Sequence, residues 1–394
     1  MRLIHTSDWH LGRIFFKTHL VEDQAYVLEQ FIGIVEQERP DVVVIAGDVY
    51  DRSAPCVEAV ELLDDVLSRI VLRLGLPVVI IAGNHDSPER IGFCSGLMEA
   101  GGLHIAGMPD AARPIEFRDA YGPVWVVPLP YAEPAVVRDR LSASGAAGAA
   151  AAASATDHDA ALAAQVSAVA WACPEAFADG ERRIAVAHAL VYGGDTCESE
   201  RLLTLGGSGA VDSARFDGFC YTALGHLHRP QPITGTACRY SGSLLKYSFS
   251  EADQPKSVSL VEIDGQGTAR VATIPLTPRR DVRCLSGSLA ELIARAQHDP
   301  GRDDYLSVQL SDADAVWDGL GRLREHYPNV MQLELPRFEP GDSGDRRLAG
   351  AGRGWSQISL EEQFREFYQQ TTGEIPDDEH MTAFREAVAG VDVV

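Results

Sequence analysis

Residues of the kinds that bind metal ions follow several separate apolar runs in this 394-residue sequence. The clearest case is Gly83-Asn84-His85-Asp86, which comes directly after the apolar residues 77–82. Alone, such a segment is most often an ordinary turn, and a lone aspartate or histidine is most often structural. The pattern recurs after four other apolar runs, however, and that many coincidences are improbable. The residues concerned are Asp8, His10, Asp48, Asn84, His188, His226 and His228.

Carboxylate, amide and imidazole ligands in this number suit two divalent ions about 3.5–4 Å apart. Mixed oxygen and nitrogen ligands favour manganese or iron over a thiolate zinc site, and the seven cysteines include no C-x-x-C pair. Asp48 is central in the order and has two carboxylate oxygens, so we predict that it bridges the ions. The other ligands divide into two groups of three, which are Asp8, His10 and His228, and Asn84, His188 and His226.

A pair of such ions activates water and polarises phosphoryl oxygens, which predicts hydrolysis of phosphate esters. His85 stands beside a predicted ligand without being needed as one. We therefore predict that His85 is the general acid that protonates the leaving alcohol. Either Asp51 or a backbone carbonyl would orient its ring.

The elements that position these residues begin with alternating strands and helices. Apolar runs at residues 2–6, 41–46 and 77–82 predict strands, and helical stripes at about 23–36 and 57–74 separate them. This order predicts right-handed crossovers and a parallel sheet. Ligands at the carboxyl ends of parallel strands share an edge, so we expect the whole set at the same edge of one sheet.

The rest of the chain is predicted to be richer in strands. We expect them at 124–129, in a second sheet, and at 184–187, 221–224, 258–263 and 269–274. An Ala-rich helix is expected at about 156–173, after a low-complexity insertion at 142–153. Beyond a boundary near 275–280, a small α/β unit is expected up to residue 338, with strands at 282–285 and 305–310 and helices at 290–296 and 313–326.

The C-terminal part combines a predicted linker with a predicted helical tail. Residues 339–354 are rich in Gly, Asp and Arg, which is typical of a linker. The period of a helix then resumes at Ile358, Phe364, Phe367 and Tyr368. This aromatic stripe either packs on its own domain or docks on a partner, and the sequence leaves both open.

The chain resembles the calcineurin-like metallophosphoesterases in its motifs, which are Asp8-x-His10, Gly47-Asp48-x-x-Asp51, Gly83-Asn84-His85-Asp86, His188 and Gly225-His226-x-His228. More narrowly, residues 5–13, 46–51 and 224–231 resemble the SbcD family, the nuclease subunits of bacterial SbcCD complexes. The likeness is strong over about residues 1–275 and looser beyond them. One departure is Ala187, since the broad family usually has glycine before the histidine that corresponds to His188.

The resemblance implies an α/β fold, with a four-layer αββα metallophosphoesterase sandwich at 1–278, a small α/β capping domain at 279–338, the linker at 339–354 and partner-binding helices at 355–394. It implies a Mn2+-dependent DNA nuclease, both a double-strand 3'-to-5' exonuclease and a single-strand and hairpin endonuclease, that processes DNA ends in repair, recombination and replication. It also implies a complex of two SbcC ATPase chains with two SbcD chains, in which the SbcC coiled coil receives the C-terminal helices.

The charge of the chain is an objection to a nucleic-acid partner, because 57 acidic side chains outnumber 34 basic ones and the formal net charge is −23. Four arginines nevertheless follow the ligand segments, namely Arg13, Arg52, Arg90 and Arg229. We predict that they surround the metal site and contact DNA, because local charge matters more than the total. Alternatively, they are ordinary solvated side chains.

Two other functions stay open. A phosphodiesterase for small nucleotides would need neither the unit after residue 281 nor the tail, and a non-catalytic scaffold would have no use for a complete ligand set. No run of about 20 apolar residues and no signal segment occurs, so we expect a cytoplasmic protein without membrane contact.

Overall fold

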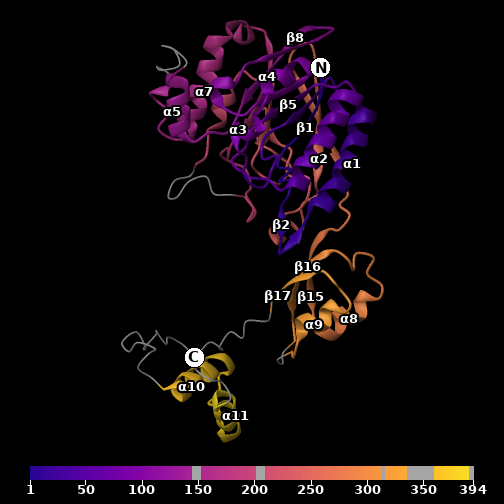
Figure 1. The fold of residues 1–394 in the computed structure, drawn as a ribbon, viewed down its shortest axis with the longest axis vertical. Coiled ribbons are helices and arrows are strands. Elements are labelled where there is room, and N and C mark those ends of the chain that lie inside the picture. The colour runs from indigo at the N-terminus through magenta and orange to yellow at the C-terminus, as the bar shows by residue number, and fades with distance from the viewer. Residues whose placement is uncertain (144–151, 201–208, 313–315, 335–358, 390–394) are drawn as a thin grey trace.

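The computed structural model describes residues 1–143, 152–200, 209–312, 316–334 and 359–389 (Figure 1). Its larger part contains two six-stranded sheets. The first sheet has the strand order β14 (Ala269–Pro275), β13 (Ser257–Ile263), β1 (Arg2–Thr6), β4 (Val42–Ile45), β5 (Val78–Ile81) and β6 (Leu103–Ala106). The strands β1, β4, β5 and β6 run parallel, as the alternating pattern predicted, and β13 and β14 close the sheet in antiparallel fashion.

The second sheet repeats this plan with a parallel centre and antiparallel edges. Its strand order is β11 (Gln231–Pro232), β12 (Cys238–Tyr240), β10 (Tyr221–Gly225), β9 (Arg182–His188), β8 (Gly122–Leu129) and β7 (Ile115–Asp119). The strand that we expected at 124–129, in a second sheet, is therefore confirmed as β8.

Four layers follow from the way side chains alternate along the strands. In β1, Leu3 packs between the two sheets, whereas Ile4 packs against the helices on the other face. The outer face of the first sheet is covered by α1 (Val21–Glu38) and α2 (Val57–Ser68), and that of the second sheet by α7 (His158–Ala172) (Figure 1). The predicted αββα sandwich is thus confirmed.

Shorter elements connect these layers. They are the hairpin of β2 (Ile14–Phe15) and β3 (Thr18–His19), the π-helical turn Arg69–Arg73, the helices α3 (Pro88–Ile91), α4 (Ser95–Met98) and α5 (Pro134–Ser142), and 3-10 turns at Glu99–Gly101, Pro109–Ala111, Pro174–Phe177, Ser213–Phe216 and Phe249–Glu251. Most of the predicted low-complexity insertion, residues 144–151, lies outside the described residues. No described helix is long and apolar enough to cross a membrane.

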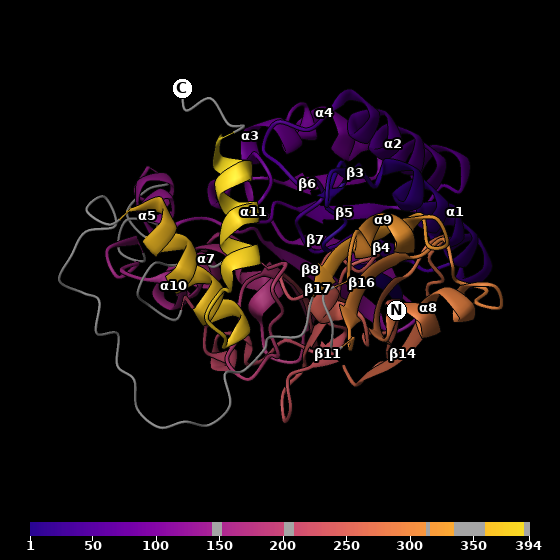
Figure 2. The same cartoon turned by 90° about the horizontal axis from the view of Figure 1, so that it is seen from below.

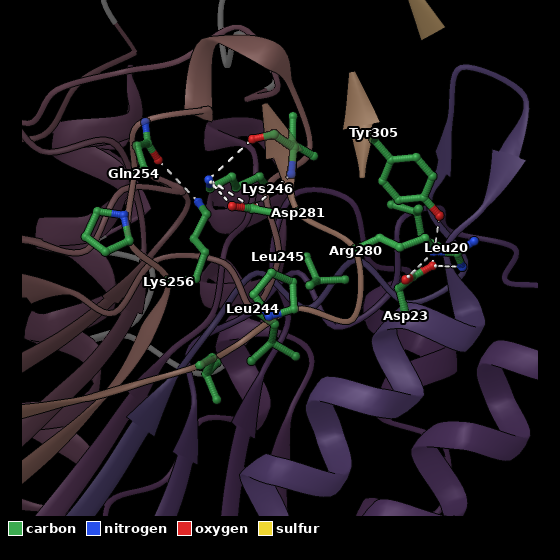
Figure 3. Close-up of a pocket in the computed structure, with 14 residues that line it drawn as sticks. Leu20, Asp23, Leu244, Leu245, Lys246, Gln254, Lys256, Arg280, Asp281 and Tyr305 are labelled. Atoms are coloured by element: carbon green, nitrogen blue, oxygen red, sulfur yellow. Dashed lines mark hydrogen bonds and ion pairs between the residues drawn. The ribbon is translucent and has the colours of Figure 1, made fainter. Parts of the chain in front are cut away.

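A third, parallel sheet contains β15 (Val282–Gly287), β16 (Tyr305–Leu310) and β17 (Val330–Glu334), with α8 (Leu289–Ala296) and α9 (Gly319–Arg324) packed on it. It is joined to α1 by polar contacts. The buried carboxylate of Asp23 accepts hydrogen bonds from Arg280 at 2.6 and 3.0 Å and from the Tyr305 hydroxyl at 2.9 Å (Figure 3). Close by, Lys246 pairs with Asp281 at 2.9 Å.

The C-terminal helices α10 (Leu360–Thr372) and α11 (Asp378–Ala389) lie side by side (Figure 2). Phe364 and Phe384 stack with ring centroids 4.2 Å apart, so the predicted aromatic stripe joins the two helices. Ile358 and the predicted linker at 339–354 lie outside the described residues. The division of the chain into 1–278, 279–338 and 355–394 stays a prediction.

The expectation that one sheet carries all the predicted ligands is wrong. Strands β1, β4 and β5 belong to the first sheet, whereas β9 and β10 belong to the second. Apolar runs that are buried on both faces identify strands, but they do not say which sheet a strand joins.

A partly buried ion pair clamps the two sheets at the end opposite to the predicted site. Asp119 accepts hydrogen bonds from Arg182 at 2.6 and 2.8 Å and from the terminal amine of Met1 at 2.7 Å. Met1 begins the strand that leads to Asp8, and Arg182 begins the strand that leads to His188. The clamp therefore fixes the starting points of two strands that carry predicted ligands.

We expect Asp119→Asn to lower the free energy of unfolding by about 2–3 kcal/mol, because it leaves the Arg182 guanidinium buried without a countercharge. The hydrogen bond from Arg182 holds the pKa of Asp119 well below its usual range. Since the folded pKa is depressed, this stabilisation is present above the unfolded pKa of about 3.9 and is lost as the pH falls below it. Urea unfolding at about pH 7 and about pH 3 should show a smaller difference between variant and native chain at the lower pH. An equal difference at both values would contradict this account.

Candidate metal centre

The predicted ligands lie where the carboxyl ends of β1, β4, β5, β9 and β10 face one another across the two sheets. Four of them adopt the left-handed backbone conformation, with φ of 53° at Asp8, 46° at His10, 49° at Asp48 and 108° at His226. Such a conformation costs about 1–3 kcal/mol for a residue with a side chain and is concentrated at functional sites. Hydrogen bonds between the loops hold it, from the Asp8 amide to the Gly47 carbonyl and from the His10 amide to the Asp48 carbonyl, each at 3.0 Å.

Two glycines allow these loops to approach closely. A Cβ atom on Gly83 would lie 2.2 Å from the Asp48 Oδ1, and one on Gly225 would lie 2.0 Å from the Ala46 carbonyl oxygen. Any larger residue would push the carboxylate or the second sheet away. The Gly-Asn-His-Asp and Gly-His-x-His motifs therefore need their glycines for space.

Asp48 lies between the two predicted ligand groups. Its Oδ2 is 3.7 Å from the Nε2 of His10 and 3.5 Å from the Nε2 of His188, and its Oδ1 accepts the backbone amide of His85 at 2.8 Å. One carboxylate oxygen that faces an imidazole from each group is what a bridging ligand requires.

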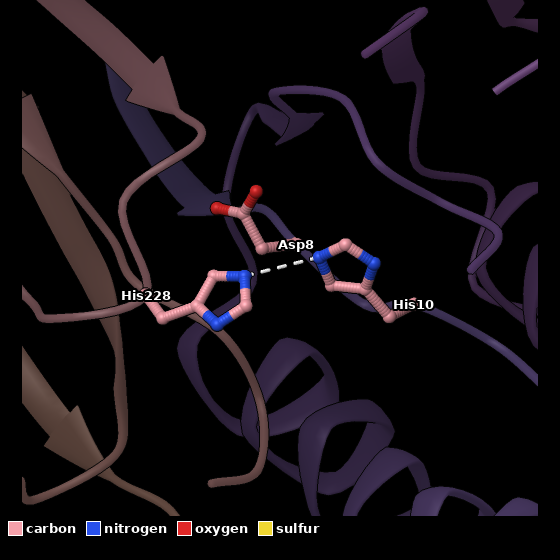
Figure 4. Close-up of side chains that lie close together, drawn as sticks. All are labelled: Asp8, His10 and His228. Carbon is pink, nitrogen blue, oxygen red and sulfur yellow. Dashed lines mark hydrogen bonds between the residues drawn. The ribbon is translucent and has the colours of Figure 1, made fainter. Parts of the chain in front are cut away.

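The first group joins β1 to the loop after β10 (Figure 4). The Nε2 atoms of His10 and His228 are 3.1 Å apart, and the Asp8 carboxylate lies beside them. Asp8 also accepts the backbone amide of His226 at 3.0 and 3.2 Å, which ties the two sheets together at this point. All three side chains are buried.

The second group gathers around the Asn84 side-chain oxygen. This oxygen lies 2.9 Å from the Nε2 of His188 and 3.0 Å from the Nδ1 of His226. His188 donates its Nδ1 proton to the Ala46 carbonyl at 2.9 Å, which leaves a lone pair on Nε2 when the ring is neutral. Lone pairs of His188 and Asn84 then face each other, and a cation between them would satisfy both. The residues present therefore fit a pair of divalent ions.

The pKa shifts of the candidate ligands also indicate that a cation would be stabilised at this site. Burial disfavours the imidazolium of His188, yet the carboxylates of Asp48 and Asp8 outweigh it and raise the pKa of this histidine to about 9. Burial also raises the pKa of Asp8 to about 6, and lowers that of His226 to about 3. The carboxylates thus create a negative potential at His188 that outweighs its burial, and a divalent ion would neutralise the same potential.

His85 is held at the edge of the centre. Its Nδ1 donates to the backbone carbonyl of Asp51 at 2.8 Å, so the carbonyl, and not the Asp51 carboxylate, orients the ring. The carboxylate instead accepts from Arg13 at 2.7 Å and lies 3.7 Å from the Nδ1 of His10. This leaves the Nε2 of His85 as the nitrogen that can exchange a proton.

The four predicted DNA-binding arginines follow the ligand residues closely in the sequence, with Arg90 on α3, but they are not equally accessible. Arg13 is held by Asp51 and lies over the Tyr247 ring, with its guanidinium carbon 5.5 Å from the centroid. Arg52 and Arg229 are 68% and 46% exposed, and Arg90 is exposed and donates to the Ser53 carbonyl.

Sequence patterns missed several residues that support the centre. The buried Asp86 accepts the backbone amides of Gly83, Val49 and Tyr50, and burial together with the charge of Asp48 raises its pKa to about 7. It belonged to a quoted motif, but its role as a link between two loops needs the tertiary structure.

Gln24 on α1 donates to the carbonyls of Trp9 at 3.1 Å and His10 at 2.7 Å. Ser199 and Glu251 approach the second ring nitrogen of His228. They lie far from the ligands in the sequence, and no local motif marks them.

We expect Asp48→Asn to hold fewer than two Mn2+ ions, because the amide replaces the carboxylate that faces both groups. Metal content after loading and dialysis measures this directly. In the native chain, Mn2+ at about 100 times its Kd should raise the free energy of unfolding by about 2.7 kcal/mol per site, and the variant should lose part of that gain. Asp119→Asn removes a half-buried carboxylate at the far end of the sheets and should keep both ions. If Asp48→Asn held two Mn2+ ions, the predicted bridging role of Asp48 would be wrong.

Sequence comparison identifies two matching families. A calcineurin-like phosphoesterase profile matches residues 1–230. A second profile, SbcD_C, described as a type 5 capsule protein repressor C-terminal domain, matches residues 278–372.

Solved structures similar to this chain include TT1561 of Thermus thermophilus, with 14% identity, 69% of this chain and 98% of that chain covered, and a TM-score of 0.39. A dimetal phosphatase from Danio rerio (LOC 393393) has 14% identity, 70% and 99% coverage and a TM-score of 0.39. GAP50, the anchor in the inner membrane complex of Plasmodium, has 11% identity, 87% and 99% coverage and a TM-score of 0.38. The phosphoesterase profile spans more than half of the residues, and the chain belongs to the calcineurin-like phosphoesterase family.

Proposed function

We propose that this chain is the nuclease subunit of an SbcCD-type complex, which hydrolyses phosphodiester bonds at DNA ends and hairpins with two Mn2+ ions. The observation that carries the proposal is the SbcD_C match at 278–372, directly after a phosphoesterase domain with a complete set of candidate ligands. A pair of divalent ions would supply activation of water and polarisation of the scissile phosphate. Asp8, His10 and His228 would hold one ion, Asn84, His188 and His226 the other, with Asp48 between them.

His85 would act as the general acid. The Asp51 carbonyl keeps a proton on Nδ1, so proton transfer to a leaving alcohol takes place from Nε2 of the imidazolium. The ring is half-buried and meets the ring of His10 edge to face at 4.7 Å. It therefore stands beside the ligands and reaches solvent on its other side.

DNA would approach along the loops that carry the exposed arginines Arg52, Arg90 and Arg229. Arg13 would contribute through Asp51, by placing a positive charge next to the metal ligands. Because the chain as a whole is acidic, most of the phosphate contacts would come from its partner.

The partner would be the SbcC ATPase, in a complex of two SbcC and two SbcD chains, with the C-terminal helices docked on the SbcC coiled coil. Exposed apolar side chains in this region support this role, since Leu360 on α10 is 56% exposed and Ile375, between α10 and α11, is 73% exposed. A small-nucleotide phosphodiesterase would leave both the tail and the third sheet without a purpose. A non-catalytic scaffold could use the tail to bind partners, but it would have no use for the complete set of candidate ligands and His85.

We expect His85→Ala to lower Mn2+-dependent release of nucleotides from a linear duplex by about 100-fold or more, with both ions retained. The assay uses the full chain with and without the SbcC partner and ATP. His104→Ala, which removes a half-buried histidine on β6 outside the ligand loops, serves as the matched control and should be fully active. Equal activity of His85→Ala and the native chain would remove His85 from the mechanism. Hydrolysis of a small phosphodiester without DNA cleavage would favour the small-nucleotide alternative.

The arginines generate a separate prediction. Arg52→Glu combined with Arg229→Glu should weaken duplex binding by the assembled complex and reduce the dependence of log K on log[salt], by about 0.9 for each lost phosphate contact. Arg118→Glu, at a 72% exposed arginine at the opposite end of the second sheet, is the control. Titrations at several salt concentrations measure both quantities. If the double variant and the control behaved alike, the arginines would be ordinary solvated side chains.

A further inference from the structure

A buried polar network lies behind His228, on the side away from the other ligands. Its centre is Glu251, which is completely buried, and its cation is Lys256, which is 5% exposed. The Lys256 ammonium contacts the Glu251 carboxylate and donates to the His228 carbonyl at 2.8 Å and to the Ser243 hydroxyl at 3.0 Å. Figure 3 shows the same ammonium beside Gln254.

The direction of each hydrogen bond in this network follows from the groups present. A carboxylate paired with a lysine can only accept, so the Ser199 hydroxyl donates its proton to the Glu251 Oε1 at 2.6 Å. The oxygen of Ser199 is then an acceptor towards His228 Nδ1, which lies 2.8 Å away. The Nδ1 of His228 must therefore carry the proton, and its Nε2 keeps the lone pair.

The selected nitrogen is the one that faces the candidate metal site. The Nε2 of His228 lies 3.1 Å from the Nε2 of His10, next to Asp8. A histidine that binds a metal usually donates its other N–H to a carboxylate or carbonyl, which fixes the tautomer and the ring orientation. Here the carboxylate acts through an intervening serine.

We propose that Glu251 is a positioning residue for the metal centre, and that it sets the tautomer and ring angle of His228 through Ser199 while the contact with Lys256 fixes the position of its carboxylate. The proposal rests on the proposed metal site. A buried ion pair is in general a poor source of stability, because desolvation offsets the attraction between the charges. The position of this pair against a metal ligand gives it a function that a hydrophobic pair of the same volume would lack.

The competing account is that Glu251 and Lys256 only fasten the segment between residues 243 and 256. Glu251 also accepts the backbone amide of Tyr247 at 3.1 Å, and Lys256 binds Ser243, so such a role is real. A purely structural pair, however, would change stability without changing the affinity of one ion relative to the other. This difference defines the test.

The experiment measures Mn2+ binding to the full chain by calorimetry and records the visible absorption of Co2+ in the same site. Ser199→Ala removes the relay but leaves the buried ion pair intact, and Ser199→Thr keeps the hydroxyl. Glu251→Gln removes the charge that directs the serine. Asp119→Asn is the control for a broken, partly buried ion pair that lies away from the candidate metal site.

We expect Ser199→Ala and Glu251→Gln to lower the affinity for one of the two Mn2+ ions by about 10- to 100-fold and to leave the affinity for the other unchanged. Both variants should also alter the Co2+ spectrum. Ser199→Thr should bind both ions as the native chain does, and Asp119→Asn should lose stability only. Native affinities in Ser199→Ala would overturn the proposal, even if Glu251→Gln failed to fold. A native chain that binds two ions but cleaves no phosphodiester would overturn the proposed function and leave this inference standing, and a native chain that binds none would overturn both.

Discussion

The two sheets approach each other closely at the Ala46 carbonyl oxygen, and the candidate metal centre depends on that approach. Gly225 of the second sheet sits against this oxygen with no room for a Cβ atom, and His188 donates to it. The backbone amide of His226 reaches across in the same way to the carboxylate of Asp8. If the sheets stood one side chain further apart, the ligands of β9 and β10 would no longer meet those of β1, β4 and β5.

The approach brings together groups that would not otherwise stay buried. Oxygen and nitrogen lone pairs from both sheets face one another at about 3 Å, and four of the residues that carry them hold a left-handed backbone. Both features are unfavourable in isolation. Hydrogen bonds between loops and two hydrophobic cores maintain the arrangement, and a cation would turn mutual repulsion into coordination.

Much of this could be predicted from the sequence, because the pattern is local. Apolar runs before Asp8, Asp48 and Asn84 predicted the parallel strands, and the helical stripes matched α1, α2 and α7 closely. The choice of sheet was beyond such reasoning, since a strand buried on both faces has no periodicity to show its neighbours. The expected helix at 313–326 is in fact α9, which begins only at Gly319, because Asp318 caps it by accepting the amide of Gly321. β17 was not predicted, because its five residues, Val330–Glu334, form only a short pattern. Ser199 and Glu251 could not be found either, since their importance comes from contacts across 29 and 23 residues of sequence.

The first turn of α1 has two neighbouring residues with different attachments. Asp23 accepts hydrogen bonds from Arg280 and Tyr305 on the side of the third sheet. Gln24 donates hydrogen bonds to the backbone carbonyls of Trp9 and His10 in the candidate ligand loop after β1. The residue that binds the third sheet and the residue that holds the loop of a candidate ligand are therefore adjacent in the sequence. The third sheet and the loop that carries His10 thus share one short segment of α1, and they also share one hydrophobic core, to which Tyr305 and Trp9 both belong.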